Sequence, residues 1–213
     1  MDEGQTVFLV DDDADIRGSL SRALGLRGYE VKSFSSAQQF LDAYENGLSG
    51  CLILDYGMPQ MDGLQLQKHL RDAGSRLPII FITGHGGIPE SVEAMKMGAV
   101  DFLEKPFKQS VLIERIEGAL ETDAKQRAVL LEKSGVLERF QALTDREQEI
   151  ALILTTSPGQ NSSKEIARQL GISPRTVDHH RARILEKMDV GTVAELVETS
   201  LKAGLFSDAD HPS

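Results

Sequence analysis

The sequence contains few of the residues that mark secreted, disulfide-bonded or membrane-spanning proteins. It has one cysteine, no tryptophan and only 5% aromatic residues in a chain of 213. The single cysteine, Cys51, excludes an intramolecular disulfide and stands at the head of an apolar run, a position typical of a small buried side chain. No apolar stretch approaches the roughly 18 residues of a transmembrane helix, and the N-terminus lacks the pattern of a signal peptide. These absences predict a cytoplasmic protein that has no membrane partner.

Negative charge is concentrated in the N-terminal part of the chain. The formal net charge is −10, and residues 1–122 carry 11 Lys and Arg against 19 Asp and Glu. Residues 160–188 show the opposite balance, with 6 basic residues against 3 acidic ones. The whole-chain charge argues against nucleic-acid binding, but the local basic excess keeps that function open for the C-terminal part.

The first 120 or so residues alternate between strand-like and helix-like segments. Apolar runs at residues 6–10, 51–54, 78–82 and 100–104 have the length and side-chain content of buried strands, and residues 29–34 alternate as a partly exposed strand. Amphipathic segments separate these runs. Repeated β–α alternation predicts a doubly wound parallel sheet of five strands.

Four of the apolar runs deliver polar groups at their C-terminal ends. The first ends in Asp11-Asp12-Asp13, the second in Asp55, the third in Thr83 and the fourth in Lys105. Ligands bind at this edge of an open parallel sheet, so carboxylates, a hydroxyl and an ammonium are expected to converge there. Such a set suits a divalent metal and a phosphoryl group.

A long helical pattern begins near Ser110. An apolar seam at heptad spacing runs through residues 113–137, and the polar residues Asp123 and Arg127 interrupt it. We expect Gly135 to break the helix, and we interpret the segment as the last helix of the first domain running into a helical linker. A coiled-coil dimer through the seam is an open alternative that the polar positions weaken.

The C-terminal part reads as four short helices. Thr144 and Glu147 form a capping box at the start of the first helix. A turn containing Gly171 separates the second helix from the third, for which Ser173 is the N-cap and Pro174 the first residue. This arrangement predicts an all-α domain with a helix-turn-helix unit.

Residues 1–122 resemble a bacterial response-regulator receiver domain, in particular its FixJ branch, which implies a flavodoxin-like fold. The resemblance rests on Asp11-Asp12, on Met58-Pro59 and Asp62-Gly63 after Asp55, and on the runs at 82–85 and 98–107. Residues 143–206 resemble the LuxR-type helix-turn-helix, through Leu143-Thr144-Asp145-Arg146-Glu147, Lys164-Glu165-Ile166-Ala167 and Leu170-Gly171-Ile172-Ser173. Together they indicate a two-component response regulator of the FixJ/NarL family. The expected divisions are a receiver at 1–122, a helical linker at 123–142, the DNA-binding domain at 143–206 and a flexible tail at 207–213.

The receiver resemblance implies a role for each polar group at the sheet edge. Asp55 would be the phosphoacceptor, whose carboxylate attacks phosphorus and becomes an acyl phosphate. Mg²⁺ would be the cofactor. Its implied ligands are the carboxylates of Asp12 and Asp55, the backbone carbonyl of Gly57 and, through water, Asp11.

The same resemblance implies a conformational switch beside the phosphoacceptor. Lys105 would hold a phosphate oxygen, and its bond to Pro106 is often cis in this family. Thr83 and Phe102 would form the switch pair, in which the hydroxyl moves to the phosphoryl group and the ring turns inward. His85 is expected to be an ordinary loop histidine.

The LuxR-type resemblance implies that the third helix of the domain enters the major groove. Asp178, His179 and Ala182 would face base edges, where Asp178 could accept from a cytosine amino group or instead orient Arg181 or His179. Salt-dependent contacts to the DNA backbone or positions close to it are implied for Lys164, Arg175, Thr176, Arg181, Arg183 and Lys187.

These expectations combine into one function. A sensor histidine kinase would phosphorylate Asp55, the surface at residues 88–115 would change, and a homodimer would bind promoter DNA, with RNA polymerase as a further partner. The protein would not be an enzyme, although it would catalyse its own phosphoryl transfer and could dephosphorylate itself. Two alternatives stay open: a phosphate sink that drains a kinase, and a DNA-binding protein that works without phosphorylation.

Overall fold

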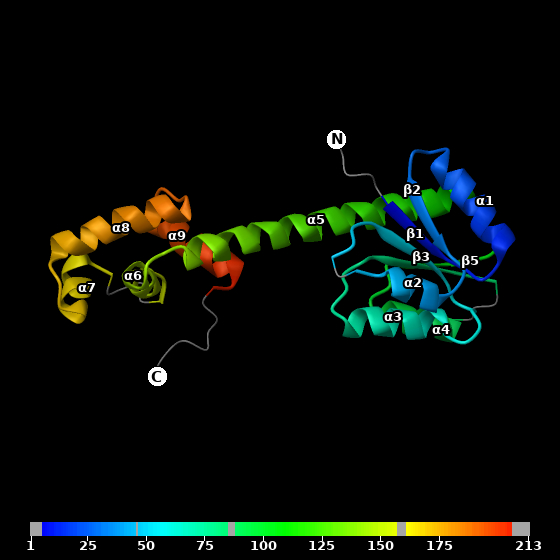
Figure 1. Ribbon diagram of the computed structural model, residues 1–213, viewed down its shortest axis with the longest axis horizontal. Coiled ribbons are helices and arrows are strands. Elements are labelled where there is room, and N and C mark those ends of the chain that lie inside the picture. The colour runs from blue at the N-terminus through cyan, green and yellow to red at the C-terminus, as the bar shows by residue number, and fades with distance from the viewer. Residues whose placement is uncertain (1–5, 46, 85–87, 157–160, 206–213) are drawn as a thin grey trace. The chain divides into compact units, whose positions relative to one another are not determined.

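The computed structural model describes residues 6–45, 47–84, 88–156 and 161–205 (Figure 1). The chain forms two compact units, Met1–Gln126 and Arg127–Ser213. Each is described by itself below. Among the described residues, no helix is both long and apolar enough to cross a membrane.

A five-stranded parallel sheet forms the centre of the first unit, in the order β2-β1-β3-β4-β5. The strands are β1 (Thr6–Val10), β2 (Glu30–Phe34), β3 (Cys51–Asp55), β4 (Ile79–Thr83) and β5 (Asp101–Glu104). The predicted strand number and direction are confirmed. β1, β3 and β4 are buried along their whole length, because side chains on both faces of the sheet are covered.

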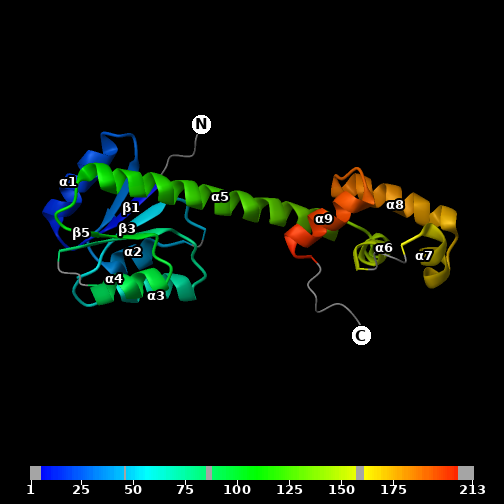
Figure 2. The same ribbon diagram turned by 180° about the vertical axis from the view of Figure 1, so that it is seen from behind.

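Helices cover the two faces of this sheet (Figures 1 and 2). One face packs against α2 (Ala37–Ala43), α3 (Gly63–Asp72) and α4 (Ile88–Lys96), in a core that contains Phe40 and Phe81. The other face packs against α1 (Ala14–Gly25) and the first part of α5 (Gln109–Gln141), in a core that contains Leu24 and Ile116. Alternate strand residues enter the two cores, as the pleat requires.

The helix α5 differs from the sequence-based expectation. It continues without a break through Gly135 to Gln141, so the predicted break at Gly135 is wrong. A glycine in a helix interior costs only about 1 kcal/mol relative to alanine, and packing can offset that cost. Val136, the next residue, is 2% exposed and belongs to the core of the second unit, as does the partly buried Phe140.

The apolar seam of α5 is divided between two environments. Ile116 and Leu120 are buried in the receiver core, whereas Leu130 is 37% exposed and Leu137 is 44% exposed. Asp123 accepts hydrogen bonds from the hydroxyl of Ser49 and the amide of Gly50, at 3.1 Å each. Any helix–helix seam between two copies is therefore restricted to the part of α5 that follows the receiver core.

The second unit contains four helices after the end of α5. They are α6 (Asp145–Thr156), α7 (Ser163–Leu170), α8 (Pro174–Met188) and α9 (Val193–Ala203). The amide of Thr144 donates to Glu147, and the amide of Glu147 to Thr144, which confirms the capping box before α6. Gly171 ends α7 at φ 65°, a left-handed conformation that glycine adopts readily, and Ser173 caps α8. The four-helix arrangement and its turn are confirmed.

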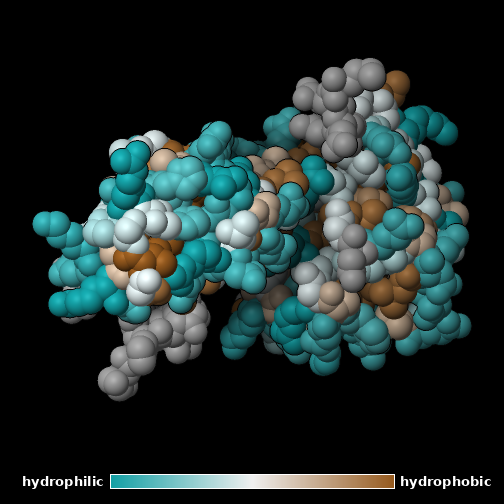
Figure 3. Space-filling model, turned by 60° about the vertical axis from the view of Figure 1, so that its left-hand side comes forward, coloured by the Kyte–Doolittle hydropathy of each residue, from teal (hydrophilic) through white to brown (hydrophobic). Residues whose placement is uncertain are grey.

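The second unit has a core of its own. Ile166 of α7 and Val177 and Ile184 of α8 are fully buried together. This packing holds the two helices of the turn at a fixed angle and leaves the opposite side of α8 exposed. On the face drawn in Figure 3, hydrophilic side chains predominate and hydrophobic ones form small groups.

Candidate phosphoryl-transfer site and nucleic-acid interface

Three carboxylates meet at the C-terminal edge of the sheet in the first unit. Asp11 and Asp12 follow β1 and Asp55 ends β3, and an oxygen from each lies within 4.8 Å of the others. β1 and β3 are hydrogen-bonded neighbours, so their ends lie side by side. Asp11 is 1% exposed and Asp55 is 6% exposed, whereas Asp12 is open to solvent. The structure thus brings together the three acidic residues predicted for the metal site.

Lys105 lies between the two buried carboxylates. Its Nζ atom is 2.8 Å from Oδ2 of Asp11 and 2.9 Å from Oδ1 of Asp55. Burial raises the pKa of Asp55, the hydrogen bond from Lys105 opposes this rise, and the nearby charge of Asp11 adds to it. Burial lowers the pKa of Lys105, but its bonds to both carboxylates outweigh this and raise it. One ammonium is shared by two carboxylates, and the cluster keeps an excess of negative charge.

Asp13, the third acid after β1, has a structural role. Its side chain caps α1 by accepting from the amides of Asp15 and Ile16, at 2.8 and 3.2 Å. The amide of Asp13 donates to Asp11 at 2.8 Å, which fixes the Asp11 carboxylate. Of the three consecutive acids, Asp13 therefore caps α1, and Asp11 and Asp12 line the site.

The segment after Asp55 is held close to that residue by two glycines. The amide of Gly57 donates to Oδ2 of Asp55 at 3.1 Å. A Cβ atom on Gly63 would lie 2.6 Å from the carbonyl oxygen of Asp55 and 2.7 Å from the ring of Phe81. No side chain fits at Gly63, so the chain returns directly against Asp55. The sequence analysis noted Gly63 as part of a motif but missed this reason for it.

The two residues of the predicted switch lie on neighbouring strands. Thr83 ends β4 and is 2% exposed, while Phe102 lies on β5 and is partly buried. The ring of Phe102 is 6.1 Å from that of Phe81 and 6.4 Å from that of Tyr56, between ring centroids. Tyr56, which directly follows Asp55, was not predicted as part of this aromatic group.

Three further residues lie near this edge in the sequence: Pro106, Tyr56 and His85. The peptide bond between Lys105 and Pro106 is cis, as expected. Burial and the charges of Glu90 and Asp62 raise the pKa of Tyr56. His85 lies outside the described residues.

Most of the residues predicted to contact DNA are exposed on α7 and α8. Arg181 and Lys187 are partly buried. The exposed ones are Lys164, Arg175, Thr176, Asp178, His179, Ala182 and Arg183. The basic face of α8 is therefore exposed, as a helix that enters a DNA groove has to be.

A hydrogen-bonded bridge connects α7 with α8. The hydroxyl of Ser163 donates to Oδ1 of Asp178 at 2.5 Å, and Arg181 Nη1 donates to the Ser163 hydroxyl at 3.2 Å and to the carbonyl of Asn161 at 3.3 Å. Of the roles considered for Asp178, the structure contains the one in which this carboxylate helps to orient Arg181. Ser163, the residue that joins them, was missed because serine at a helix start usually signals capping alone.

One buried carboxylate, Glu147, lies in this unit among the described residues and is 1% exposed. Its partners are Lys187 Nζ at 2.6 Å, Arg183 Nε at 3.7 Å and the amide of Thr144 at 2.9 Å. Burial acts to raise the pKa of Glu147, but the hydrogen bonds from Lys187 and Thr144 prevail and lower it to about 2. Lys187 and Arg183, both predicted near the DNA backbone, thus have a carboxylate partner within the protein. From the sequence, Glu147 was expected only to cap α6.

Comparison with known proteins identifies the families of the two units. Residues 7–117 match the response regulator receiver domain, and residues 141–200 match the bacterial regulatory proteins of the luxR family. The transcriptional regulatory protein FixJ of Bradyrhizobium diazoefficiens is 40% identical over 205 residues, 95% of this chain and 97% of that protein. The response regulator protein TodT of Pseudomonas putida is 38% identical over 199 residues, 93% of this chain and 86% of that protein.

Solved structures show the same relationship. A low-resolution structure of the response regulator StyR has a TM-score of 0.84 and 40% identity, and the match covers 92% of this chain and 98% of that one. Full-length FixJ from B. japonicum has a TM-score of 0.58 and 38% identity, with 97% and 100% covered.

A receiver domain followed by a LuxR-type helix-turn-helix defines a class of transcriptional regulators that act in two-component systems. The chain belongs to this class, as a response regulator of the FixJ/NarL family.

Proposed function

We propose that a sensor histidine kinase phosphorylates this protein on Asp55 and that phosphorylation controls its binding to promoter DNA. The observation that carries the proposal is the cluster at the sheet edge, where Asp11, Asp12 and Asp55 lie together and Lys105 joins two of them. No other group of three or more metal-binding side chains was found among the described residues.

The residues present at the cluster fit Mg²⁺. Two buried carboxylates share one ammonium, and the donors are all oxygens, which Mg²⁺ prefers. The residues that would hold the ion are Asp12, Asp55 and the backbone carbonyl of Gly57, with Asp11 acting through water. When bound, Mg²⁺ supplies positive charge against the anionic oxygens of a phosphoryl group.

The chain's own residues would perform the transfer. A carboxylate oxygen of Asp55 attacks phosphorus, the bond from phosphorus to the histidine nitrogen of the kinase breaks, and an acyl phosphate forms. Lys105 exchanges its bond to Asp55 for one to a phosphoryl oxygen, because the carboxylate loses its negative charge when it becomes the mixed anhydride and the phosphoryl group carries that charge instead. The protein thus accepts a phosphoryl group by self-catalysed transfer, and hydrolysis of the acyl phosphate returns it to the starting state.

The switch would carry this event to the receiver surface. Phosphorylation adds roughly 1.5–2 negative charges and three acceptors beside Thr83. The Thr83 hydroxyl turns toward the phosphoryl group, Phe102 moves into the space, and the surface at residues 88–115 changes. We infer that two copies then associate and place their α8 helices in successive major grooves, in the cytoplasm, where RNA polymerase is the further partner.

Contacts from α7 and α8 would divide between bases and phosphates. His179 and Ala182 would face base edges, and Asp178 would act there chiefly by orienting Arg181. The phosphate contacts would come from Lys164, Arg175, Thr176, Arg181, Arg183 and Lys187. We propose the same domain limits as in the sequence analysis: 1–122, 123–142, 143–206 and a tail at 207–213.

A selection experiment tests the proposal without a known operator. Double-stranded DNA would be enriched from a random pool with the full chain in Mg²⁺ and beryllofluoride, and the affinity for the selected sequence measured by fluorescence anisotropy. We expect binding to tighten by about tenfold with beryllofluoride, equal to about 1.4 kcal/mol, and the Asp55→Asn variant to show no such change. Equal affinity with and without beryllofluoride would mean that phosphorylation does not control DNA binding. Failure to enrich any sequence would favour a phosphate sink.

A further inference from the structure

A cavity of about 440 Å³ opens at the edge of the receiver sheet opposite the phosphoacceptor. It lies between the C-terminal end of α3, the start of β4, the end of α4 and α5. No residue of the phosphoryl-transfer site lines it, although Met97, Gly98 and Val100 belong to the surface at residues 88–115. α3 and α4 cover the same face of the sheet (Figure 1). The volume is in the range of small-molecule binding sites.

The charge of this cavity contrasts with that of its unit. Two arginines, Arg71 and Arg76, line it, and no acidic residue does, although residues 1–122 carry a net charge of −8. Arg76 has no hydrogen bond or ion pair with any other described residue, and the one ion pair of Arg71 is a 3.8 Å contact with Asp72. Two guanidinium groups are thus available to an anion.

The inner wall is apolar except for one amide. Leu70, Leu77 and Ile79 are at most 7% exposed and line the cavity. Gln67, also in the wall, is 2% exposed, and its Nε2 atom donates to the carbonyl of Ala94 at 3.1 Å. Its Oε1 atom has no hydrogen-bond partner in the described part of the chain. A buried acceptor without a partner is unfavourable, and a donor from a ligand would satisfy it once the Gln67 amide turned toward the cavity.

We propose that this cavity binds a small organic anion. The apolar body of the ligand packs on Leu70, Leu77 and Ile79, and its anionic group pairs with Arg76 and Arg71. The Gln67 amide turns toward the cavity and accepts from an N–H or O–H group of the ligand. A carboxylate and a phosphate ester share the chemistry that the two arginines recognise.

The position of the cavity gives the ligand a regulatory effect. Thr122 and Gln126 of α5 form one wall, and Gln126 is the last residue of the receiver unit. A bound ligand therefore contacts α5 just before this helix enters the second unit. Ligand binding at one end of the sheet would therefore regulate the protein separately from phosphorylation at the other end.

Nuclear magnetic resonance of the ¹⁵N-labelled full chain tests the proposal with three probes. These are 4-hydroxyphenylacetate, the neutral 4-hydroxybenzyl alcohol and inorganic phosphate. We expect the carboxylate to shift the amide signals of residues 67–79 in a saturable manner below about 10 mM and to bind about tenfold more tightly than the alcohol. Competition by phosphate at similar concentration would indicate a phosphorylated natural ligand, and its absence a carboxylate. No saturable shift at these residues, or equal binding of the alcohol, would overturn the proposal.

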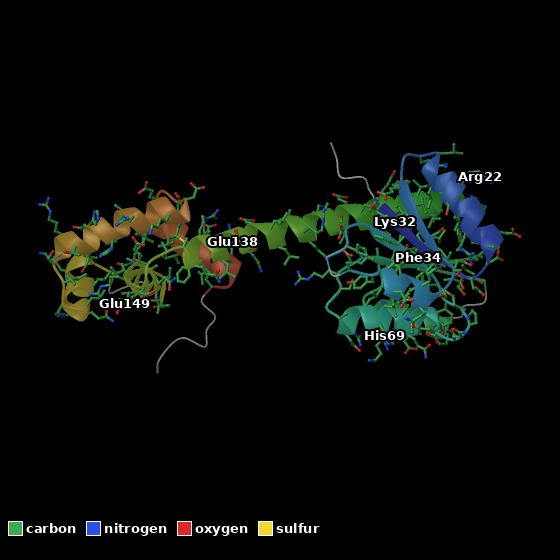
Figure 4. The ribbon with its side chains drawn as sticks, viewed as in Figure 1. Arg22, Lys32, Phe34, His69, Glu138 and Glu149 are labelled. Carbon is green, nitrogen blue, oxygen red and sulfur yellow. The ribbon has the colours of Figure 1, made fainter. Side chains whose placement is uncertain are left out.

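Matched variants locate the binding. Arg76→Gln should weaken binding of 4-hydroxyphenylacetate by about tenfold, and Gln67→Leu by a smaller factor. Arg22→Gln is the control, because Arg22 is also exposed but lies on α1, away from the cavity (Figure 4). Asp55→Asn should bind as the wild type does, so a failure here is distinguishable from a failure of the phosphorylation proposal. Equal loss in Arg22→Gln and Arg76→Gln would contradict the assigned site.

Discussion

Each unit of this protein contains a buried cluster of carboxylates and cations, and the two clusters are balanced in opposite ways. In the receiver, Asp11 and Asp55 share the single ammonium of Lys105. In the DNA-binding unit, one carboxylate, Glu147, has Lys187 and Arg183 as its cationic partners. The first cluster has an excess of negative charge, and the second has an excess of positive charge.

The pKa shifts record this difference. The pKa of Asp55 is raised, since burial and the charge of Asp11 outweigh the one ammonium. The pKa of Glu147 is lowered to about 2, since two hydrogen-bonding partners outweigh burial. A buried carboxylate that lacks compensation is suited to receive a cation or a proton, whereas a fully compensated one stabilises the fold. This difference supports the proposal that the receiver cluster carries the chemistry and that the Glu147 cluster stabilises the fold.

The largest expected effect comes from replacing Asp55, the proposed nucleophile of the receiver cluster. Asp55→Asn keeps the shape of the side chain but cannot form an acyl phosphate, so phosphorylation by acetyl phosphate in Mg²⁺ should fall at least about 100-fold. The measurement is intact-protein mass spectrometry, with borohydride reduction to locate the modified residue in the wild type. Labelling of the variant at the wild-type level would place the phosphoacceptor elsewhere.

Changing Glu147 should lower the stability of the second unit without affecting phosphorylation. Glu147→Gln leaves Lys187 next to a neutral buried group, and we expect the second unit to lose about 2–3 kcal/mol in its free energy of unfolding. Urea unfolding followed by helical circular dichroism measures it. Phosphorylation of Asp55 should stay unchanged.

The exposed Glu149 provides the matched control for this change. Glu149 pairs with Arg146 at the surface of the same helix, α6 (Figure 4). Glu149→Gln should therefore cost no more than about 0.5 kcal/mol. If the two variants lost the same stability, burial of Glu147 would not be the cause.

The two clusters should respond to pH in opposite directions. The lowered pKa of Glu147 gives stability that is present above about 4.5 and is lost as the pH falls toward about 2. The raised pKa of Asp55 means that its ionised form costs stability, so this cost disappears as the pH falls through the raised value. Hydrogen exchange, resolved by unit and followed as the pH is lowered, measures the stability of each unit in the wild type, in Asp55→Asn and in Glu147→Gln. A pH dependence of the second unit that persists in Glu147→Gln would contradict the assignment.

The smallest effect concerns the bridge at the DNA-binding surface. Ser163→Ala removes the hydroxyl that joins Asp178 to Arg181, and Arg181 would lose part of its orientation. We expect about threefold weaker binding to the selected DNA, with the stability nearly unchanged. Ser162→Ala, which removes a helix cap on the same turn, should instead lower stability by about 1 kcal/mol. A threefold loss of affinity in both variants would show that capping, and not the bridge, is responsible.

The sequence predicts most of the fold and of the receiver site, because the relevant signals are local. β1, β3 and β4 are continuous apolar runs buried on both faces. Because the strands are parallel, the polar residues at their C-terminal ends all lie at the same edge of the sheet. What the sequence could not show depends on tertiary packing. Gly135 remains helical because Val136 is buried in a core built from residues far along the chain. Glu147 has a cap pattern, yet its main partner is 40 residues away.

The contrast between the clusters is tested most directly by adding Mg²⁺ to the full chain and following hydrogen exchange in both units at once. At about 10 mM Mg²⁺, the account predicts slower exchange in peptides that contain Asp11, Asp55 and Lys105, because an ion bound only by the folded state stabilises it. Peptides that contain Glu147 and Lys187 should exchange as before, which makes the second unit the internal control. Unchanged exchange around Asp55, or equal slowing in both units, would contradict the claim that the receiver cluster alone is built to receive a cation.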